Sequence, residues 1–298
     1  MKVRESGIGL STALGFVVFS FAANSVITRF MVANDLVSPF ALTVIRFGSG
    51  LGMLVALHLA LPRAFPRVPA KRANLMGGLL LGSYGFSISF GYLFIGAAAG
   101  TFVFFAAVVL SMALLGVAVE HERLGPRELV GLALAVAGVF LLTYGGVALV
   151  TGVGVVLMIV TGVSWGAYSV FGRRFTEDFS FTLYSFVILT VVALPSLLLT
   201  SPGDLLDVPV SLEGWGLALY FGTISTALSY VVWHWALNRI TASQGGIYQM
   251  VIPVIAAVMG IAFLSEEPSL SLVAGGGLII LGIYLNRKSA PSEPEEDR

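Results

Sequence analysis

The chain has 298 residues, of which 57% are hydrophobic and 11% are charged, and its mean hydropathy is +0.95. Soluble domains average about 25% charged residues, so this composition excludes a soluble globular protein and indicates an integral membrane protein. The formal net charge of zero argues against a polyanionic partner such as nucleic acid, and the absence of cysteine excludes disulfides and thiol chemistry.

Apolar runs follow one another along the chain, each long enough to cross a hydrocarbon layer of about 30 Å as a helix of about 20 residues. The runs are continuous, whereas a membrane β-barrel would need short segments of alternating hydrophobicity. We therefore expect an all-α integral membrane fold with ten transmembrane helices. The expected spans are 7–32, 38–61, 74–96, 99–119, 127–147, 151–172, 180–200, 213–237, 243–264 and 270–286.

The two halves of the chain repeat one pattern at an offset of 144 residues. Glu122 in the first half matches Glu266 in the second, and far upstream Arg29 matches Arg173. Because the match runs from the first spans to the last, one five-helix unit has been duplicated. The expected domains are a first repeat at 1–147, a second at 148–288 and a disordered cytoplasmic tail at 289–298.

The distribution of positive charge predicts the topology. With a cytoplasmic N-terminus, all Lys and Arg residues except Arg29 and Arg46 fall on the cytoplasmic side, as positive residues in short loops do. Both termini are then cytoplasmic. An odd number of spans per repeat inverts the second half relative to the first, an arrangement usual in alternating-access transporters with a central site between the halves. We expect a multi-pass protein of the inner (plasma) membrane.

Each half ends in a span, a glutamate, a short turn and a Gly-rich span. The first half carries Ala-Leu-Leu-Gly-Val-Ala-Val-Glu-His-Glu-Arg-Leu, and the second carries Ile-Pro-Val-Ile-Ala-Ala-Val-Met-Gly-Ile-Ala-Phe-Leu-Ser-Glu-Glu-Pro. This pattern resembles the EamA-type repeat of the drug/metabolite transporter superfamily, although Val109 stands where the second half has Pro253. The resemblance implies ten helices around a central cavity and export of small metabolites, with exporters of amino acids, including aromatic ones, among the relatives.

Arg46 is the one fixed charge that falls clearly inside a predicted span. An ionisable residue there costs about 3 kcal/mol or more unless it faces protein or a water-filled cavity. One interpretation is that its planar guanidinium binds a substrate carboxylate. The other is that it holds neighbouring helices together, which the resemblance favours because a second-span arginine recurs among members with differing substrates.

Further candidates are aromatic, amide and histidine side chains on spans expected to line the cavity. Such a wall suits an amphipathic or aromatic ligand through stacking and a few directed hydrogen bonds, although aromatic residues also serve as plain packing. His234, between two tryptophans, either binds substrate or belongs to an interfacial aromatic cluster. The candidate substrate-binding residues are Asn24, Arg46, Tyr84, Trp165, Tyr168, Tyr230, His234, Tyr248 and Gln249.

No carboxylate is expected at membrane depth, which disfavours strongly proton-coupled antiport and multivalent cationic substrates. Glu122 and Glu266 are expected to be structural carboxylates at helix boundaries. We expect a secondary transporter that exports small amphipathic metabolites, amino acids above all, by alternating access. A multidrug or nucleotide-sugar permease is the alternative within this class.

An intramembrane enzyme is disfavoured because the sequence lacks a deep acid pair, metal-ligand spacing or a Ser–His pairing, and a channel is left to experiment. No cofactor or metal is expected. The expected partners are a small-molecule substrate and membrane lipid. One chain of ten helices can enclose a cavity, so a monomer is expected and a dimer stays open.

Overall fold

The computed structural model describes residues 7–61, 71–120, 125–144, 150–173, 178–193, 210–237, 239, 249 and 251–286. Within these residues the regular secondary structure is helical, apart from one isolated bridge between Ile95 and Val150. The all-α prediction is confirmed for this part of the chain.

The helices follow the apolar runs closely. Three elements, α9, η3 and α10, continue directly into one another over 212–237, where a single span was expected. The elements are α1 (Gly7–Ala33), α2 (Pro39–Ala60), α3 (Lys71–Phe94), α4 (Ala97–Glu120), α5 (Pro126–Tyr144), α6 (Gly152–Arg173), α7 (Asp178–Val187), the π-helical η2 (Ile188–Ala193), α9 (Leu212–Tyr220), the π-helical η3 (Phe221–Leu228), α10 (Ser229–Leu237), α12 (Val251–Leu264) and α13 (Leu270–Asn286).

Hydroxyl side chains start several of these helices. Ser38 precedes α2 and accepts a hydrogen bond from the Ala41 N–H at 3.1 Å, with Pro39 at the first helical position. Ser211 caps α9 through the Gly214 N–H at 2.9 Å in the same way. These local signals fix helix starts that hydropathy alone leaves uncertain by a few residues.

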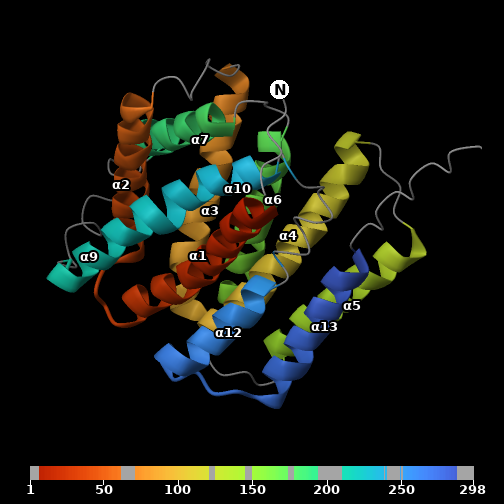
Figure 1. Cartoon of the computed structure of the whole chain (residues 1–298). Helices are drawn as coiled ribbons and strands as arrows, with labels where there is room; N and C mark the ends of the chain where they lie inside the picture. Colours follow the sequence, from red (N-terminus) through yellow and green to blue (C-terminus); the bar gives the residue numbers. More distant parts are fainter. Residues whose placement is uncertain are drawn as a thin grey trace, which may run out of the picture.

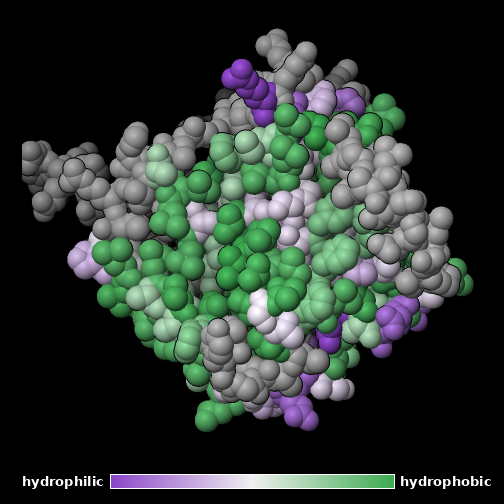
Figure 2. Space-filling view, turned by 180° about the vertical axis from the view of Figure 1, so that it is seen from behind, coloured by the Kyte–Doolittle hydropathy of each residue, from purple (hydrophilic) through white to green (hydrophobic). Residues whose placement is uncertain are grey.

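Within the described residues, four helices are long and apolar enough, by length and composition alone, to cross a membrane: Gly9–Ala33, Pro39–Ala60, Gly152–Gly172 and Leu212–Ala236. The surface agrees with a lipid environment. Figure 2 shows one face of the molecule covered broadly by apolar residues, with hydrophilic residues mostly at its margins. Large side chains such as Phe140 and Leu129 on α5 are 63% and 55% exposed, which suits contact with lipid tails and not with water.

Helices α5 and α13 lie side by side at one flank of the bundle (Figure 1). Glycine permits this close approach, because a β-carbon on Gly138 would lie 2.6 Å from the Gly275 carbonyl oxygen, and one on Gly275 would lie 3.0 Å from the Gly138 carbonyl oxygen. Backbone contact through small residues is the usual way for helices to associate in lipid, where apolar burial gives no driving force.

The interior of the bundle is formed by the other helices. α6 packs against both α3 and α4, α1 packs against α10 and α12, and α2 packs against η3. α1 and the α9–η3–α10 run cross the middle of the molecule in Figure 1, with α3 and α6 behind them. These central helices carry most of the candidate site residues.

Candidate substrate site

A small cavity lies where α1, α3, α4, α6 and α10 meet. Four of the predicted site residues line it, namely Asn24, Tyr84, Trp165 and Tyr230. The remaining lining residues are Phe21, Ser25, Ile88, Phe104 and Phe105. Its volume is about 10 Å³, room for about one water molecule. The site is therefore closed, and its side chains must separate before it can hold a metabolite.

Aromatic rings fill this region in edge-to-face and tilted contacts. The Trp165 ring lies 4.8 Å from Tyr230, 5.3 Å from Tyr84 and 5.5 Å from Phe21, centroid to centroid. Such contacts contribute about 0.5–1.5 kcal/mol each beyond their burial. Trp165 is thus the hub of the cluster, and its buried indole Nε1 has no hydrogen-bond partner in the described structure.

Arg46 lies fully buried directly behind two of these rings. Its Nε donates to the Thr226 hydroxyl at 2.8 Å, and one terminal nitrogen, NH2, lies 3.2 Å from each of the Tyr84 and Tyr230 hydroxyls. The other terminal nitrogen, NH1, is buried and has no partner among the described residues. The guanidinium thus joins α2 to α3, η3 and α10 and keeps one donor free.

The charge of Arg46 is met by rings and hydroxyls, with no carboxylate bonded to it in the described part of the chain. Its guanidinium carbon lies 4.2 Å from the Phe221 ring centroid and 5.0 Å from that of Phe47. Cation–π contact offsets part of the cost of burial, but an anion would offset more. The site is rich in donors and carries an uncompensated positive charge.

The π-helical turn of η3 explains how Thr226 reaches this position. Gly222 in η3 lies against the α2 backbone, and a β-carbon there would meet the Arg46 carbonyl. This close approach of η3 to α2 accompanies the hydrogen bond between the Thr226 hydroxyl and Arg46. π-Helical turns are rare and occur often at functional sites.

Asn24 is held by a reciprocal pair of hydrogen bonds with Ser225 of η3. Its Nδ2 donates to the Ser225 carbonyl at 3.0 Å, and the Ser225 hydroxyl donates to Asn24 Oδ1 at 2.6 Å. The same hydroxyl lies 3.1 Å from the Ser20 carbonyl. The amide is therefore fixed in orientation and ties α1 to η3 at the edge of the cavity.

His234 and Tyr168 form a second buried cluster beside the cavity. His234 Nδ1 lies 2.9 Å from the Thr182 hydroxyl, and its Nε2 is buried without a partner in the described structure. The Tyr168 ring lies between this histidine and Trp165, at centroid distances of 5.6 and 5.7 Å. Neither residue lines the cavity.

Of the remaining predicted residues, Gln249 is buried and its Oε1 has no partner among the described residues, whereas Tyr248 lies outside the described residues. The prediction omitted several residues that the structure places here: Phe104 and Phe105 of α4, Ser25, Ile88, Thr226 and Phe221. One signal was present, because Phe104 and Phe105 lie 144 residues before Tyr248 and Gln249.

Every acidic residue in the described part of the chain lies at a helix end or in a turn. Glu266, which follows α12, accepts hydrogen bonds from the N–H groups of Ala97 and Ala98 at the start of α4. It is a helix-boundary carboxylate, as expected, while Glu122 lies outside the described residues. No group of three or more metal-binding side chains occurs within the described ranges.

A larger groove of about 710 Å³ runs between α4, α5 and α6, lined by side chains such as Val103, Leu110 and Val156. The Ser111 hydroxyl is the one polar side-chain group in this lining. The groove offers little to recognise a metabolite and suits lipid tails. The central site remains the candidate, and it defines a helical membrane protein with a buried, cationic, aromatic-walled centre.

Comparison with known proteins identifies the family. The EamA-like transporter family matches residues 152–287. A Pseudomonas aeruginosa protein described as uncharacterized is 34% identical over 280 residues, covering 91% of this chain and 93% of its own length. A Salmonella typhimurium protein named "Probable amino-acid metabolite efflux pump" is 28% identical over 83% of this chain and 85% of its own length.

The chain belongs to the EamA-like transporter family of the drug/metabolite transporter superfamily. An Escherichia coli protein with the same efflux-pump name is 25% identical over 91% of this chain and 92% of its own length. A solved crystal structure with 20% sequence identity superposes with a TM-score of 0.67, covering 93% of this chain and 95% of that one. At that identity the likeness concerns the fold alone.

Proposed function

We propose that this protein is a secondary transporter that exports small amphipathic metabolites, amino acids above all, by alternating access. Relatives that span most of the chain are named transporters and efflux pumps, which favours a transporter over an enzyme. The proposed substrate class rests on one observation: the NH1 nitrogen of Arg46 is buried without a partner in the described structure, beside a wall of aromatic rings.

The chemistry of the site suits a ligand with a carboxylate and an apolar body. The unpartnered donor of Arg46 and its uncompensated charge favour an anionic oxygen, and charge-assisted hydrogen bonds to carboxylates are among the strongest in proteins. Trp165, Tyr84 and Phe21 offer stacking surface for the rest of the ligand. The described helices carry no acid side chain at their depth, so a purely cationic ligand would find no carboxylate partner there.

An inverted repeat is part of this proposal, and two features of the packing support it. Phe21 and Trp165, 144 residues apart, are in ring contact, as expected for equivalent residues at a two-fold axis. The helix contacts are also symmetric. The first helix of the second half, α6, packs on α3 and α4 of the first half, and the first helix of the first half, α1, packs on the equivalent α10 and α12. The last helices of the two halves, α5 and α13, pack on each other. We infer two five-helix repeats, 1–147 and 148–288, around the central site.

The proposed topology has ten spans, cytoplasmic termini and a location in the inner membrane, as the positive-inside pattern favours. The beginning of α1 and the end of α13 are each the upper end of their helix in Figure 1, which agrees with ends of the chain on one side. The α3–α4 and α12–α13 turns then face outward. The cavity lies within a single chain, so a monomer is sufficient for transport.

Reconstitution into proteoliposomes tests the proposal. Purified protein should catalyse saturable flux of a labelled aromatic or aliphatic amino acid, with protein-free liposomes as the control. Competition by the free acid, but weak competition by the same amino acid as its neutral amide, is expected from the role of Arg46. Folded protein with no saturable flux for any amino acid would refute the function, and flux of cationic drugs alone would favour a multidrug permease.

A further inference from the structure

Glu266 joins two helices that are far apart in the sequence. It follows α12, and its carboxylate accepts hydrogen bonds from the Ala97 N–H and, at 3.0 Å, from the Ala98 N–H. These are the first two residues of α4. A carboxylate at this position meets the free N–H groups and the positive end of the helix, which stabilises it there. The end of α12 is thus attached to the beginning of α4.

Two glycines make room for this carboxylate. A β-carbon on Gly96 would lie 2.8 Å from Glu266 Oε1, and one on Gly260 would lie 2.7 Å from Oε2. The backbone closes around the carboxylate from both sides, which accounts for glycine at both positions. The Glu266 carboxylate is therefore closely enclosed where it meets the start of α4.

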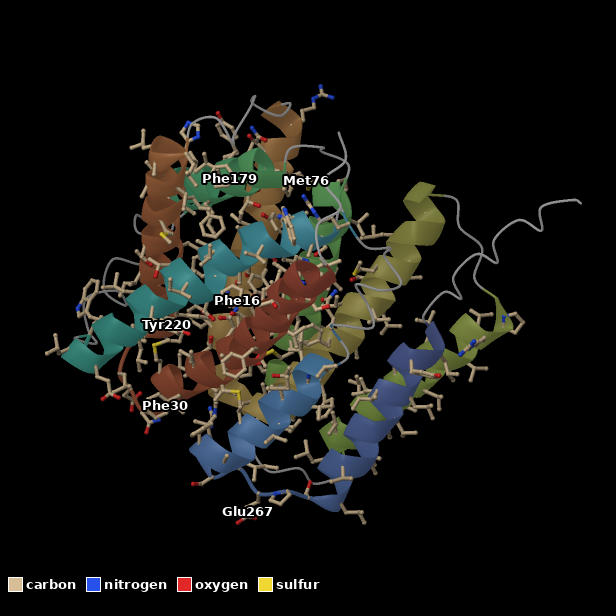
Figure 3. All side chains as sticks on the ribbon, viewed as in Figure 1. Phe16, Phe30, Met76, Phe179, Tyr220 and Glu267 are labelled. Carbon is tan, nitrogen blue, oxygen red and sulfur yellow. The ribbon has the colours of Figure 1, made fainter. Side chains whose placement is uncertain are left out.

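Arg29 of α1 binds the α3 end of the turn between α3 and α4, whereas Glu266 binds its α4 end. Its NH1 donates to the Tyr92 carbonyl near the end of α3 at 2.5 Å. Its guanidinium is half-buried, and it lines a cavity of about 340 Å³ together with Glu266 and Asn34. Phe30 and Glu267, neighbours of the two charged residues, lie at one end of the bundle in Figure 3, while Met76 and Phe179 lie at the other.

Arg29 lies on α1 and Glu266 binds the start of α4, and both of these helices also contribute residues to the wall of the central cavity. Phe104 lies seven residues, or two helical turns, after Ala97 on the same side of α4. Ser25 lies one turn before Arg29 on α1. A displacement of α4 away from Glu266 would therefore carry Phe104 away from Tyr84, whose ring centroid lies 6.0 Å from it.

The structure assigns Arg29 and Glu266 to a clasp that holds the α3–α4 turn and closes the outer end of the transport path. The inference rests on the proposed function, which places this end outside. Both side chains hold backbone groups beside a cavity that Asn34 and Ser265 also line, so their hydrogen bonds can be exchanged for water at small net cost. Arg29 and Glu266 also recur in the sequence at the 144-residue offset.

The absence of native cysteine allows a direct test. A single cysteine is placed at Ser25, in the closed cavity, and its reaction with a membrane-impermeant maleimide is followed in right-side-out vesicles. Glu266→Ala is expected to raise the labelling rate about tenfold, because losing a helix cap shifts a two-state equilibrium by about that factor. Glu266→Gln, which keeps one acceptor oxygen, should give a smaller increase, and Arg29→Ala should also raise the rate.

Glu267→Gln is the matched control, since this neighbouring carboxylate is exposed. Gly96→Ala is a second route to the same result, because the added methyl group displaces the carboxylate and leaves its charge in place. Equal labelling in all variants, or an equal increase with Glu267→Gln, would overturn the clasp, as would an increase confined to inside-out vesicles. A clasp that fails while the wild type transports amino acids leaves the proposed function standing. In the reverse outcome, the variants change the labelling rate but the wild type transports no amino acid. That result rejects the proposed function and leaves the clasp standing.

Discussion

Replacing Arg46 by methionine separates its contribution to folding from its contribution to recognition. The guanidinium makes hydrogen bonds at 2.8, 3.2 and 3.2 Å, and hydrogen bonds to a charged group contribute about 1.5–3 kcal/mol each, or about 5–9 kcal/mol together. Burying a cation with no carboxylate beside it costs several kcal/mol. Because the two effects are of similar size, we expect Arg46→Met to change the free energy of unfolding by less than about 2 kcal/mol.

The effect on ligand recognition should be much larger. A carboxylate bound to the free NH1 gains a charge-assisted hydrogen bond of about 1.5–3 kcal/mol, which corresponds to about 10- to 150-fold in affinity. Wild-type protein is therefore expected to bind an amino acid at least about tenfold more tightly than its neutral amide. In Arg46→Met this preference should fall to less than about threefold.

The measurement is a double-mutant cycle that crosses the protein variant with the ligand carboxylate. Affinities for acid and amide come from ligand-dependent thermal shifts and from competition in proteoliposomes, with the unfolding transition of the free protein recorded alongside. Undiminished preference for the acid in folded Arg46→Met would refute direct carboxylate contact. A loss of more than about 4 kcal/mol in stability would instead show that Arg46 serves mainly to hold α2, α3 and η3 together.

Three further predictions follow from the packing. Gly138→Leu should lower the free energy of unfolding by about 1–3 kcal/mol, because the new side chain meets the α13 backbone. Gly277→Leu is the control, since a β-carbon there meets nothing within 4 Å, and it should leave thermal denaturation nearly unchanged. Trp165→Ala should cost about 3–5 kcal/mol and enlarge the cavity, so that competition assays show a shift toward bulkier amino acids; unchanged selectivity would contradict its place in the wall. Asn24→Asp should cost about 1–3 kcal/mol, since the carboxylate cannot donate to the Ser225 carbonyl, and an unaltered melting temperature would contradict that pairing.

Hydropathy and the repeat predicted the helices well, because a membrane helix must be long, continuous and apolar. The all-α fold and the helix positions agree with the structure wherever it describes the chain. The π-helical turns at 188–193 and 221–228 were not predicted, and in the second of them Gly222 packs against the α2 backbone, a contact that the sequence does not show. No period in the sequence marks them.

The candidate site was only partly predictable. Asn24, Tyr84, Trp165 and Tyr230 were chosen for residue type and expected depth, and the structure brings these four around one cavity. The hydroxyl of Thr226 could not be assigned to Arg46 from sequence, because 180 residues separate them and the contact depends on how two helices cross. Phe104 and Phe105 could have been proposed from the 144-residue offset, which matches them to the predicted residues Tyr248 and Gln249.

The role of Glu266 shows the same limit. Its place at a helix boundary was evident from sequence, but its partners, the first N–H groups of α4, are backbone atoms that carry no residue-specific signal. Contacts to the backbone are set by the fold. The sequence therefore indicates which side chain lies at a helix boundary, but it does not indicate which helix that side chain binds.

Counterflow in proteoliposomes tests the central claim most directly. Vesicles loaded with an unlabelled amino acid are diluted into a trace of the labelled one. A carrier that opens its two ends in turn should transiently accumulate label inside the vesicles above the equilibrium level. We predict such an overshoot with wild-type protein, smaller with the neutral amide as the internal ligand and with Arg46→Met. Label that rises monotonically to equilibrium at every internal concentration would contradict a carrier and indicate a channel.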